Sequence, residues 1–294
     1  MTRLGAAVLG VLFAGFSMNL QAVSSRTPRS LHLRSAAAVV QDEQTGELLL
    51  VKKADVAMPI ASITKLMTAM VLLDARLDME ETITIERGDK DMLRHSISRL
   101  PVGTRLTRRH ALLVALMASE NRAAHALGRA FPGGLSALVA AMNEKARVLG
   151  LNETRFVDPT GLSDGNLSSA KDLTRLVEAA CRYPQIRAFS TQPECTIQRG
   201  RMQLHFINTN ALVRNPHWHI GLSKTGYIEA GGRCLVMQTQ LGQRSVLIVL
   251  LNSSGKHTHF ADAIRIRQWI ESSASFTRGV SQPTRPMVVH THHS

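Results

Sequence analysis

Apolar residues along this chain follow two different repeats, which predict β-strands at both ends and helices between them. Near the start, the short apolar runs 36–40 and 47–52 flank a polar turn, which is typical of a β-hairpin. Late in the chain, Gly-containing turns separate three longer runs at 220–227, 233–240 and 245–251, which predict an antiparallel meander. Together these patterns indicate one antiparallel sheet with a helical subdomain inserted into it.

The segments between the strands carry apolar residues three and four positions apart, which is the period of an α-helix. The first helix is predicted to follow Pro59 and to run from about residue 61 to residue 75. The last one, over residues 258–271, places Ala263, Ile266 and Ile270 on one face. The other helical patterns cover residues 109–118, 122–129, 135–148 and 170–182.

The first 22 residues have the layout of a secretory signal peptide. Arg3 supplies a positive charge, residues 4–16 are apolar or small, and Ala22 precedes the expected cut. An uncleaved membrane anchor is the alternative, but the apolar run is short for a membrane span. We therefore expect an exported protein. Its parts would be a polar linker over residues 23–34, one domain over 35–271 and a flexible tail over 272–294.

Export affects how the three cysteines are interpreted. An oxidising compartment permits a bridge between Cys181 and Cys195, but unpaired thiols are an equal expectation. Cys234 lies in a strand pattern and is predicted to be a buried thiol. No cysteine has the spacing of a zinc site. The His-rich residues 290–293 favour a disordered end over a metal site, so no metal or cofactor is expected.

Composition then narrows the class of partner. The 294 residues include 35 Lys and Arg against 22 Asp and Glu, which gives a formal net charge of +13. Such a charge favours an anionic partner. Aromatic residues make up only 4% and no nucleic-acid-binding motif is present, so nucleic acid is not expected. For a protein exported by a bacterium, the candidate polyanion is the cell wall with its peptide carboxylates.

A Ser-x-x-Lys pattern from Ser62 to Lys65 is the first candidate for chemistry. The same pattern begins at Ser168 and Ser253, so only its context gives it weight. Ser62 is expected in the first turn of an apolar helix, near free backbone N–H groups. Lys65 shares that helix face, and a neutral amine held beside a serine can take its proton.

Two further motifs follow in the chain. Ser119 and Asn121 form a Ser-x-Asn pattern between two predicted helices, and Lys224-Thr225-Gly226 lies in a predicted strand. Each motif alone is weak evidence for a site. A Ser-x-Asn pattern is ordinarily a polar break between helices, and a lysine in an edge strand ordinarily protects that edge against aggregation. The three motifs in this order are the pattern of penicillin-binding proteins and class A β-lactamases.

The sequence resembles the low-molecular-mass penicillin-binding proteins of the D-alanyl-D-alanine carboxypeptidase family, and more closely their D-alanyl-D-alanine endopeptidase branch in Gram-negative bacteria. The matching stretches are residues 59–70, 116–124, 156–163, 224–226 and 256–263. The resemblance implies a β-lactamase/transpeptidase-like fold of the α/β (α+β sandwich) type, with helices flanking an antiparallel sheet and an inserted all-helical subdomain. Glu120 stands where class A β-lactamases carry Asp, at a position that varies across the wider family.

The resemblance also implies catalytic roles for four side chains. Ser62 would attack the carbonyl of a D-alanine residue and form a covalent ester, with Lys65 as its base. Ser119 would pass a proton to the departing amine. Asn121 would hold the substrate amide and orient Lys65. These roles describe acyl transfer by a serine peptidase without a cofactor.

The strand motif would bind the substrate. The resemblance assigns Lys224, Thr225, Gly226 and Tyr227 to this role, with Lys224 and Thr225 holding the carboxylate next to the scissile bond. The backbone N–H groups of Ser62 and Tyr227 would form the oxyanion hole. Peptidoglycan peptide stems would be the substrate, and β-lactam antibiotics would be covalent inhibitors.

The three motifs alone do not distinguish between two activities of this family. An endopeptidase cleaves between D-alanine and the D-centre of diaminopimelate, and a carboxypeptidase releases D-alanine, so both leaving groups carry a carboxylate. The branch resemblance favours the endopeptidase. The short tail also favours it, because the family's carboxypeptidases usually append a β-rich domain and an amphipathic helix. We expect a periplasmic protein with at most loose membrane association.

Other function classes are weaker expectations. A serine β-lactamase needs a Glu four residues before an Asn ahead of Lys224, but Glu144 and Asn152 are eight apart. Residues 158–161, Asp-Pro-Thr-Gly, occupy that loop instead. Penicillin is therefore expected to acylate Ser62 and stay. A non-catalytic wall-binding protein is the alternative from another class, although every catalytic residue type is present.

Overall fold

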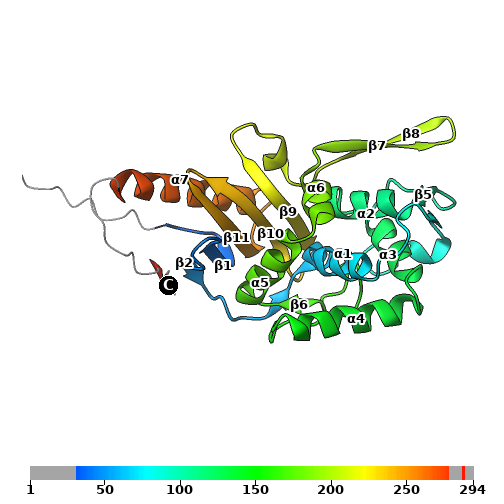
Figure 1. The fold of residues 1–294 in the computed structure, drawn as a ribbon, viewed down its shortest axis with the longest axis horizontal. Coiled ribbons are helices and arrows are strands. Elements are labelled where there is room, and N and C mark those ends of the chain that lie inside the picture. Colours follow the sequence, from blue (N-terminus) through cyan, green and yellow to red (C-terminus); the bar gives the residue numbers. More distant parts are fainter. Residues whose placement is uncertain (1–30, 278–286, 289–294) are drawn as a thin grey trace, which may run out of the picture. The chain divides into compact units, whose positions relative to one another are not determined.

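A six-stranded sheet forms the centre of the computed structural model, which describes residues 31–277 and 287–288 (Figure 1). The strand order is β12-β2-β1-β11-β10-β9. All neighbouring strands are antiparallel except β12, which pairs in parallel with β2. The strands are β1 Ser35–Asp42, β2 Leu48–Lys52, β9 His219–Ile228, β10 Gly232–Leu241, β11 Arg244–Ser253 and β12 Met287–Val288. The expected hairpin and meander are therefore confirmed as parts of one sheet.

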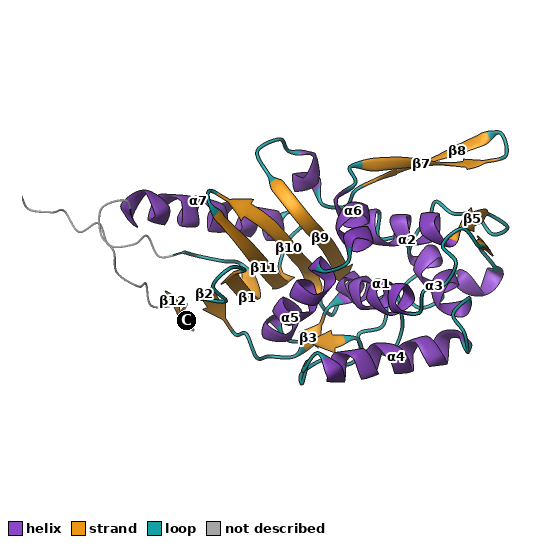
Figure 2. Cartoon of the chain, viewed as in Figure 1, coloured by secondary structure: helices purple, strands orange, loops and turns teal. Residues whose placement is uncertain are grey.

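Helices cover both faces of this sheet (Figure 2). The last helix packs on β10 and β11 from one side, and α5 packs on β11, β1 and β10 from the other. The central strands are apolar at almost every position, because successive side chains of a strand enter opposite cores. In β1, Val39 belongs to the core under α5 and Val40 to the core under α7. The helices are α1 Thr64–Asp74, α2 Arg108–Met117, α3 Asn121–Arg129, α4 Gly134–Val148, α5 Ala170–Cys181, α6 Pro184–Thr191 and α7 Thr258–Thr277.

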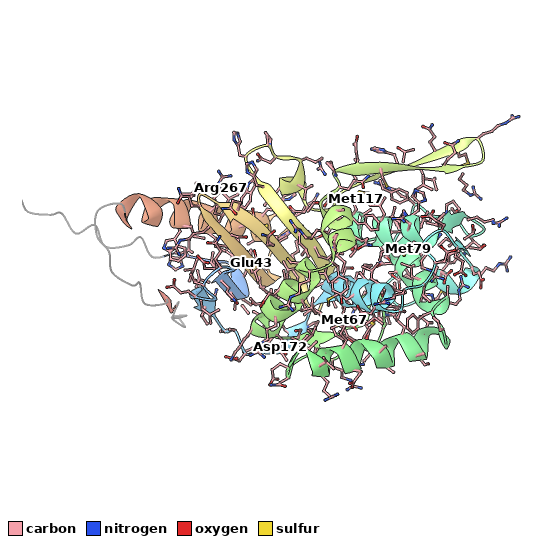
Figure 3. All side chains as sticks on the ribbon, viewed as in Figure 1. Glu43, Met67, Met79, Met117, Asp172 and Arg267 are labelled. Carbon is pink, nitrogen blue, oxygen red and sulfur yellow. The ribbon has the colours of Figure 1, made fainter. Side chains whose placement is uncertain are left out.

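Helix α1 is the central element of the inserted helical subdomain. It is buried from Thr64 to Leu72, and it contacts α2, α3, α4 and α5. A helix that is buried all round has no polar face, which explains its nearly continuous apolar sequence. The side chains of Met67 on α1 and Met117 on α2 lie within this helical layer (Figure 3). The residues at the start of α1 are thus held by packing on every side.

Three boundaries differ from the sequence expectation. The end of the expected linker packs on the sheet: Leu31 and Leu33 are buried, and Lys52 Nζ donates to the carbonyl of Leu33 at 2.9 Å. The last helix was expected to end at residue 271, but it continues to Thr277. Strand β12 adds two residues of the expected tail to the sheet. The expected signal peptide, residues 23–30 and the His-rich residues 290–293 lie outside the described residues.

Several small elements were not predicted because they are short or largely exposed. Strands β7 and β8 form a hairpin with few buried positions, and the other pairs span only two or three residues. Such segments carry little hydrophobic periodicity. The strands are β3 Met58–Pro59, β4 Thr82–Thr84, β5 Arg105–Thr107, β6 Leu167–Ser168, β7 Glu194–Arg199 and β8 Met202–Ile207. The 3₁₀-helices are η1 Ala61–Ile63, η2 Arg87–Asp89 and η3 Ala211–Arg214.

The three cysteines are free thiols in this structure. The sequence left open a bridge between Cys181 and Cys195, and the structure has the other alternative, unpaired thiols. Cys234 is fully buried in β10, as predicted. Burial raises the pKa of Cys181 to about 12 and that of Cys234 to about 11, so both stay protonated and poorly nucleophilic at neutral pH.

Asp262 on α7 ties the first strand to the last helix. Its carboxylate is fully buried and accepts hydrogen bonds from Ser35 N at 2.7 Å, Ser35 Oγ at 2.6 Å and Arg34 N at 3.2 Å. Removing the carboxylate leaves buried donors without an acceptor. We predict that Asp262→Ala lowers the free energy of unfolding by about 3 kcal/mol, measured by urea denaturation.

The control for this measurement is Glu178→Ala, which removes an exposed ion pair with Arg182 on α5. We expect it to change the free energy of unfolding by less than about 0.5 kcal/mol. An effect of Asp262→Ala no larger than that of the control would contradict the anchoring role of this carboxylate.

Candidate active site

Ser62 and Lys65 lie together at the start of the buried helix α1. Ser62 is in the middle of η1, and Ala61 before it has a φ of 48°, in the left-handed region that non-glycine residues rarely adopt. Lys65 lies one turn further on, and its Nζ donates to Ser62 Oγ at 2.7 Å. The Ser-x-x-Lys spacing therefore brings the hydroxyl and the amine into direct contact.

A sharp reversal between α2 and α3 carries the second motif. Ser119 has a φ of 59°, and the N–H of Glu120 donates to the carbonyl of Val114 at 3.1 Å, which closes the end of α2. The Glu120 carboxylate caps α3 by accepting the N–H of Arg122 at 3.3 Å. Asn121 is the first residue of α3. The turn thus presents a hydroxyl and an amide side by side.

The strand motif completes the cluster. Lys224 on β9 donates from Nζ to Ser119 Oγ at 2.8 Å, and Lys65 Nζ donates to Asn121 Oδ1 at 2.8 Å. Both lysines are only 1% exposed. The structure therefore brings together Ser62, Lys65, Ser119, Asn121 and Lys224, although they come from three distant parts of the sequence.

Strand β9 lies directly against the turn that holds Ser62. A Cβ added to Gly226 would lie 3.0 Å from the backbone N of Ser62 and 3.0 Å from the carbonyl O of Ile60, so only glycine fits without displacement. Thr225 Oγ1 donates to Thr209 Oγ1 at 2.7 Å. Tyr227 is 57% exposed, and its ring is 4.4 Å from the guanidinium of Arg233, which stacks on it.

The loop 158–163, for which the sequence predicts no role in the site, supplies a third partner of Lys65. Lys65 Nζ donates to the carbonyl of Thr160 at 2.6 Å. The Asp158 carboxylate shapes the loop by accepting the N–H groups of Thr160 at 2.6 Å, Gly161 at 2.8 Å and Ser163 at 3.0 Å. An Asp that binds backbone N–H groups two and three residues later is a local turn signal, and it was visible in the sequence.

Burial lowers the pKa of the Lys65 ammonium to about 7, against the opposing charges of Asp158, Glu120 and Asp91. Burial also lowers the pKa of Lys224 well below its ordinary value, and the nearby charge of Lys65 lowers it further. Burial alone would raise the pKa of Asp158, but its hydrogen bonds from Thr160, Ser163 and Gly161 lower it, so the loop keeps its charge.

The partners of Lys65 determine where its lone pair points when the amine is neutral. Asn121 Oδ1 and the carbonyl of Thr160 can only accept hydrogen bonds, whereas the Ser62 hydroxyl can also donate one. A neutral amine has two N–H bonds, which these two obligate acceptors take up. The remaining lone pair then faces Ser62 Oγ. This is the arrangement that a base needs to take the serine proton.

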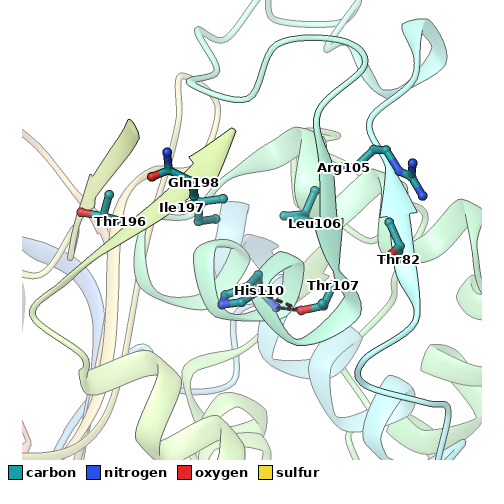
Figure 4. A pocket seen from close by; sticks show the side chains of 8 residues that line it. All are labelled: Thr82, Arg105, Leu106, Thr107, His110, Thr196, Ile197 and Gln198. Atoms are coloured by element: carbon teal, nitrogen blue, oxygen red, sulfur yellow. Dashed lines mark hydrogen bonds between the residues drawn. The ribbon is translucent and has the colours of Figure 1, made fainter. Parts of the chain in front are cut away.

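A separate groove of about 460 Å³ lies between α2 and the hairpins β4–β5 and β7–β8 (Figure 4). Within it, Thr107 Oγ1 and His110 Nδ1 share a hydrogen bond of 2.9 Å. None of the expected site residues lines this groove. Among the residues that the structure describes, no cluster of His, Cys, Asp and Glu is arranged to hold a metal ion. The groove is lined by Thr82, Arg105, Leu106, Thr107, His110, Thr196, Ile197 and Gln198.

Comparison with known proteins identifies the family of this chain. Residues 22–255 match Peptidase S11, the D-alanyl-D-alanine carboxypeptidase family. The chain belongs to this family. A D-alanyl-D-alanine endopeptidase of Pseudomonas aeruginosa is 47% identical over 247 residues, which cover 83% of this chain and 80% of that protein. A D-alanyl-D-alanine endopeptidase of Escherichia coli is 43% identical over 269 residues, which cover 91% and 86% of the two chains.

Two solved structures share the fold. The DD-transpeptidase of Streptomyces K15 superimposes with a TM-score of 0.74 at 25% identity, covering 81% of this chain and 97% of that one. A D-alanyl-D-alanine carboxypeptidase of Mycobacterium tuberculosis gives a TM-score of 0.74 at 26% identity, with 82% and 92% covered. The expected transpeptidase-like fold is confirmed.

Gly161 provides a test of the contact between the loop and the Ser62 turn. Its φ is 81°, and an added Cβ would lie 1.9 Å from the carbonyl O of Ala61. We predict that Gly161→Ala displaces the Ser62 turn and slows labelling of the protein by a fluorescent penicillin about 100-fold.

Gly103→Ala is the matched control, because Gly103 has a φ of 84° and no heavy atom lies within 4 Å of the added Cβ. We expect this control to lose only about 1 kcal/mol of stability and to label at the normal rate. Equal labelling rates for the two variants would show that the loop does not hold the turn.

Proposed function

We propose that this member of Peptidase S11 is a serine DD-endopeptidase. It hydrolyses D-alanyl–diaminopimelate cross-links in peptidoglycan through an acyl-enzyme on Ser62. The observation that carries this proposal is the contact of 2.7 Å between Lys65 Nζ and Ser62 Oγ, inside a buried cluster that leaves the amine partly neutral. The relatives named as D-alanyl-D-alanine endopeptidases in P. aeruginosa and E. coli support the choice of bond.

Acylation begins when Lys65 takes the proton of the Ser62 hydroxyl. The oxygen then attacks the carbonyl carbon of the D-alanine residue, and the carbonyl oxygen becomes an oxyanion. Backbone N–H groups of Ser62 and Tyr227 stabilise this oxyanion, and one such donor contributes about 10²–10³ in rate. The fit of Gly226 against the backbone of Ser62 supports this assignment, because β9 lies beside the serine turn.

Collapse of the tetrahedral intermediate requires a proton for the departing amine. Ser119 supplies it, and the neighbouring Lys224 ammonium, whose Nζ lies at 2.8 Å, reprotonates the Ser119 hydroxyl and becomes a neutral amine. Lys224 and Thr225 bind the carboxylate beside the scissile bond, where the Thr225 hydroxyl lies next to that of Thr209. Water then attacks the Ser62 ester and gives up a proton that restores the Lys224 ammonium by way of Ser119. Lys65 returns its proton to the Ser62 oxygen as the shortened peptide leaves, which restores the free enzyme.

The proposed place of action is the periplasm, reached through a cleaved signal peptide at residues 1–22. Peptidoglycan peptide stems are the substrate, and β-lactam antibiotics are covalent inhibitors that acylate Ser62. None of the helices over residues 31–277 combines the length and the hydropathy that crossing a membrane requires. Membrane association, if any, is loose.

Two rivals have less support. A class A β-lactamase positions its deacylating water with a glutamate. The Glu144 side chain of this protein is exposed on α4 and pairs with Arg147 at 2.6 Å. We therefore expect the penicilloyl ester on Ser62 to persist and nitrocefin turnover to be slow. A non-catalytic wall-binding protein would not need two buried lysines in contact with two serine hydroxyls.

The proposed activity is tested by incubating purified protein with cross-linked muropeptides and measuring product masses. We expect dimers to become monomers, and Ser62→Ala to abolish this conversion because it removes the nucleophile. Ser254→Ala, in an exposed turn, is the matched control and should retain full activity. Intact dimers with trimmed pentapeptides would instead establish the carboxypeptidase alternative, and no conversion of either kind would contradict the proposal.

The pH dependence tests the role of Lys65. The amine acts as a base only when neutral, so its activity is present above its pKa and is lost as the pH falls through about 7. We predict that the rate of penicillin acylation rises with pH and is half-maximal near pH 7.

Lys65→Arg should slow acylation by about 10³, because a guanidinium stays protonated at every accessible pH. An acylation rate that is constant from about pH 5 to about pH 9 would exclude Lys65 as the base.

A further inference from the structure

We propose that Ser96 and Asp91 are positioning residues, which hold the Asn121 side-chain amide so that its oxygen faces Lys65. The inference rests on the proposed function, since it concerns the base of that reaction. Neither residue belongs to the three motifs, and neither touches Ser62 or Lys65 through a hydrogen bond. They act on Lys65 through Asn121.

The segment that carries these residues, 91–98, has no regular secondary structure and is organised by the Asp91 carboxylate. This carboxylate accepts the N–H groups of Leu93, Arg94 and Ser96, each at 2.9 Å. These hydrogen bonds, together with that of the Ser96 hydroxyl, outweigh the effect of burial and lower the pKa of Asp91, which keeps its charge. Ser96 is therefore held by a charged group whose position is fixed.

The segment is also tied to the loop that contacts Lys65. Arg94 Nε donates to the carbonyl of Leu162 at 2.5 Å, two residues after Thr160, whose carbonyl accepts a hydrogen bond from Lys65. The segment 91–98 and the loop 158–163 are thus joined to each other by Arg94 beside the lysine cluster. A shift of Ser96 relative to Asn121 would have to break this tie.

A directed chain of hydrogen bonds leads from Asp91 to the base. The Asp91 carboxylate accepts the Ser96 N–H at 2.9 Å, and Ser96 Oγ accepts from Asn121 Nδ2 at 2.9 Å. Asn121 Oδ1 in turn accepts from Lys65 Nζ at 2.8 Å. The carboxylate thus fixes the backbone of Ser96, and the Ser96 hydroxyl oxygen is held where the Asn121 amide N–H donates to it.

This direction matters because an asparagine amide has two nearly isosteric orientations. In the reversed orientation Nδ2 would face Lys65 Nζ, and two donors would meet in a buried site. Lys65 would then lose Asn121 Oδ1, which is one of the two acceptors that take up its N–H bonds. Its lone pair would no longer be fixed on Ser62 Oγ. Ser96 and Asp91 disfavour this state because they hold a hydroxyl acceptor beside Nδ2 in the observed orientation.

Asp91 also acts on Lys65 through its charge. Its field is one of the three that raise the pKa of the Lys65 ammonium against the larger effect of burial. Removing the charge therefore moves the pKa of Lys65 downward. A purely structural role of Asp91 in folding the segment would leave that pKa unchanged, which gives the experiment a readout that separates the two roles.

The experiment compares Ser96→Ala, Ser96→Thr and Asp91→Asn in the full chain. The measured quantity is the second-order rate constant for acylation of Ser62 by a fluorescent penicillin, from about pH 5 to about pH 9. Ser98→Ala is the matched control, because Ser98 lies in the same segment and its hydroxyl binds only the backbone of Leu100. Thermal unfolding of each variant reports the folded fraction.

We expect Ser96→Ala to lower the high-pH plateau of the rate constant about tenfold and to shift its midpoint to lower pH. Ser96→Thr keeps the hydroxyl and should restore the wild-type plateau. Asp91→Asn should shift the midpoint to lower pH in the same direction, because it removes a negative charge from the neighbourhood of Lys65. Ser98→Ala should match the wild type in both quantities.

The proposal is overturned if Ser96→Ala and Asp91→Asn keep the wild-type plateau and midpoint. It is also overturned if their rates fall only in proportion to the folded fraction, with no change of midpoint. These outcomes are distinct from failure of the proposed function, which would appear in the wild type itself as absence of acylation at Ser62 or of muropeptide cleavage.

Discussion

Two lysine side chains are buried in one hydrogen-bonded cluster, and the arrangement of the functional site depends on this burial. An ammonium group taken out of water loses several kcal/mol of hydration. Two features of the structure offset this loss of hydration. Each amine has oxygen partners within 2.8 Å, and burial lowers the pKa of each amine, so each exchanges its proton more readily than a surface lysine does. A nitrogen that would be a point charge on the surface becomes a base in this cluster.

The fold supplies those partners from four separate places: the start of α1, the α2–α3 reversal, strand β9 and the loop 158–163. Helix α1 is buried all round, so its first turn cannot shift without disturbing the subdomain. Ala61 and Ser119 are both held at positive φ, at a cost of about 1–2 kcal/mol each. Such backbone strain persists only where the surrounding packing fixes it, and here it directs two hydroxyls toward two amines.

Much of this architecture could be predicted from the sequence because it follows from local or periodic signals. The apolar runs in β1, β10 and β11 predict strands, and the spacing from Ser62 to Lys65 places both residues on one side of a helical turn. The convergence of the Ser119 turn and of Lys224 on that site could not be derived from spacing. Resemblance to a known family predicted it, and the structure contains the contacts of Lys65 with Ser62 and of Lys224 with Ser119.

Other parts of the site carry no signal of that kind. The third partner of Lys65 is a backbone carbonyl, that of Thr160, and a carbonyl has no side-chain identity to recognise. Ser96 lies in a segment without hydrophobic period, so its contact with Asn121 depends on tertiary structure alone. The exposed hairpin β7–β8 and the packing of Leu33 under the sheet were missed because polar or short segments give little periodicity.

The most direct test of the central claim is the site of a stable covalent adduct. The protein is incubated with benzylpenicillin, weighed intact, digested and mapped by mass spectrometry. Activation of the Ser62 hydroxyl by Lys65 predicts a single penicilloyl group per chain, on the peptide that contains Ser62. An adduct on the peptide that contains Ser119, or no adduct on either serine, would contradict the account.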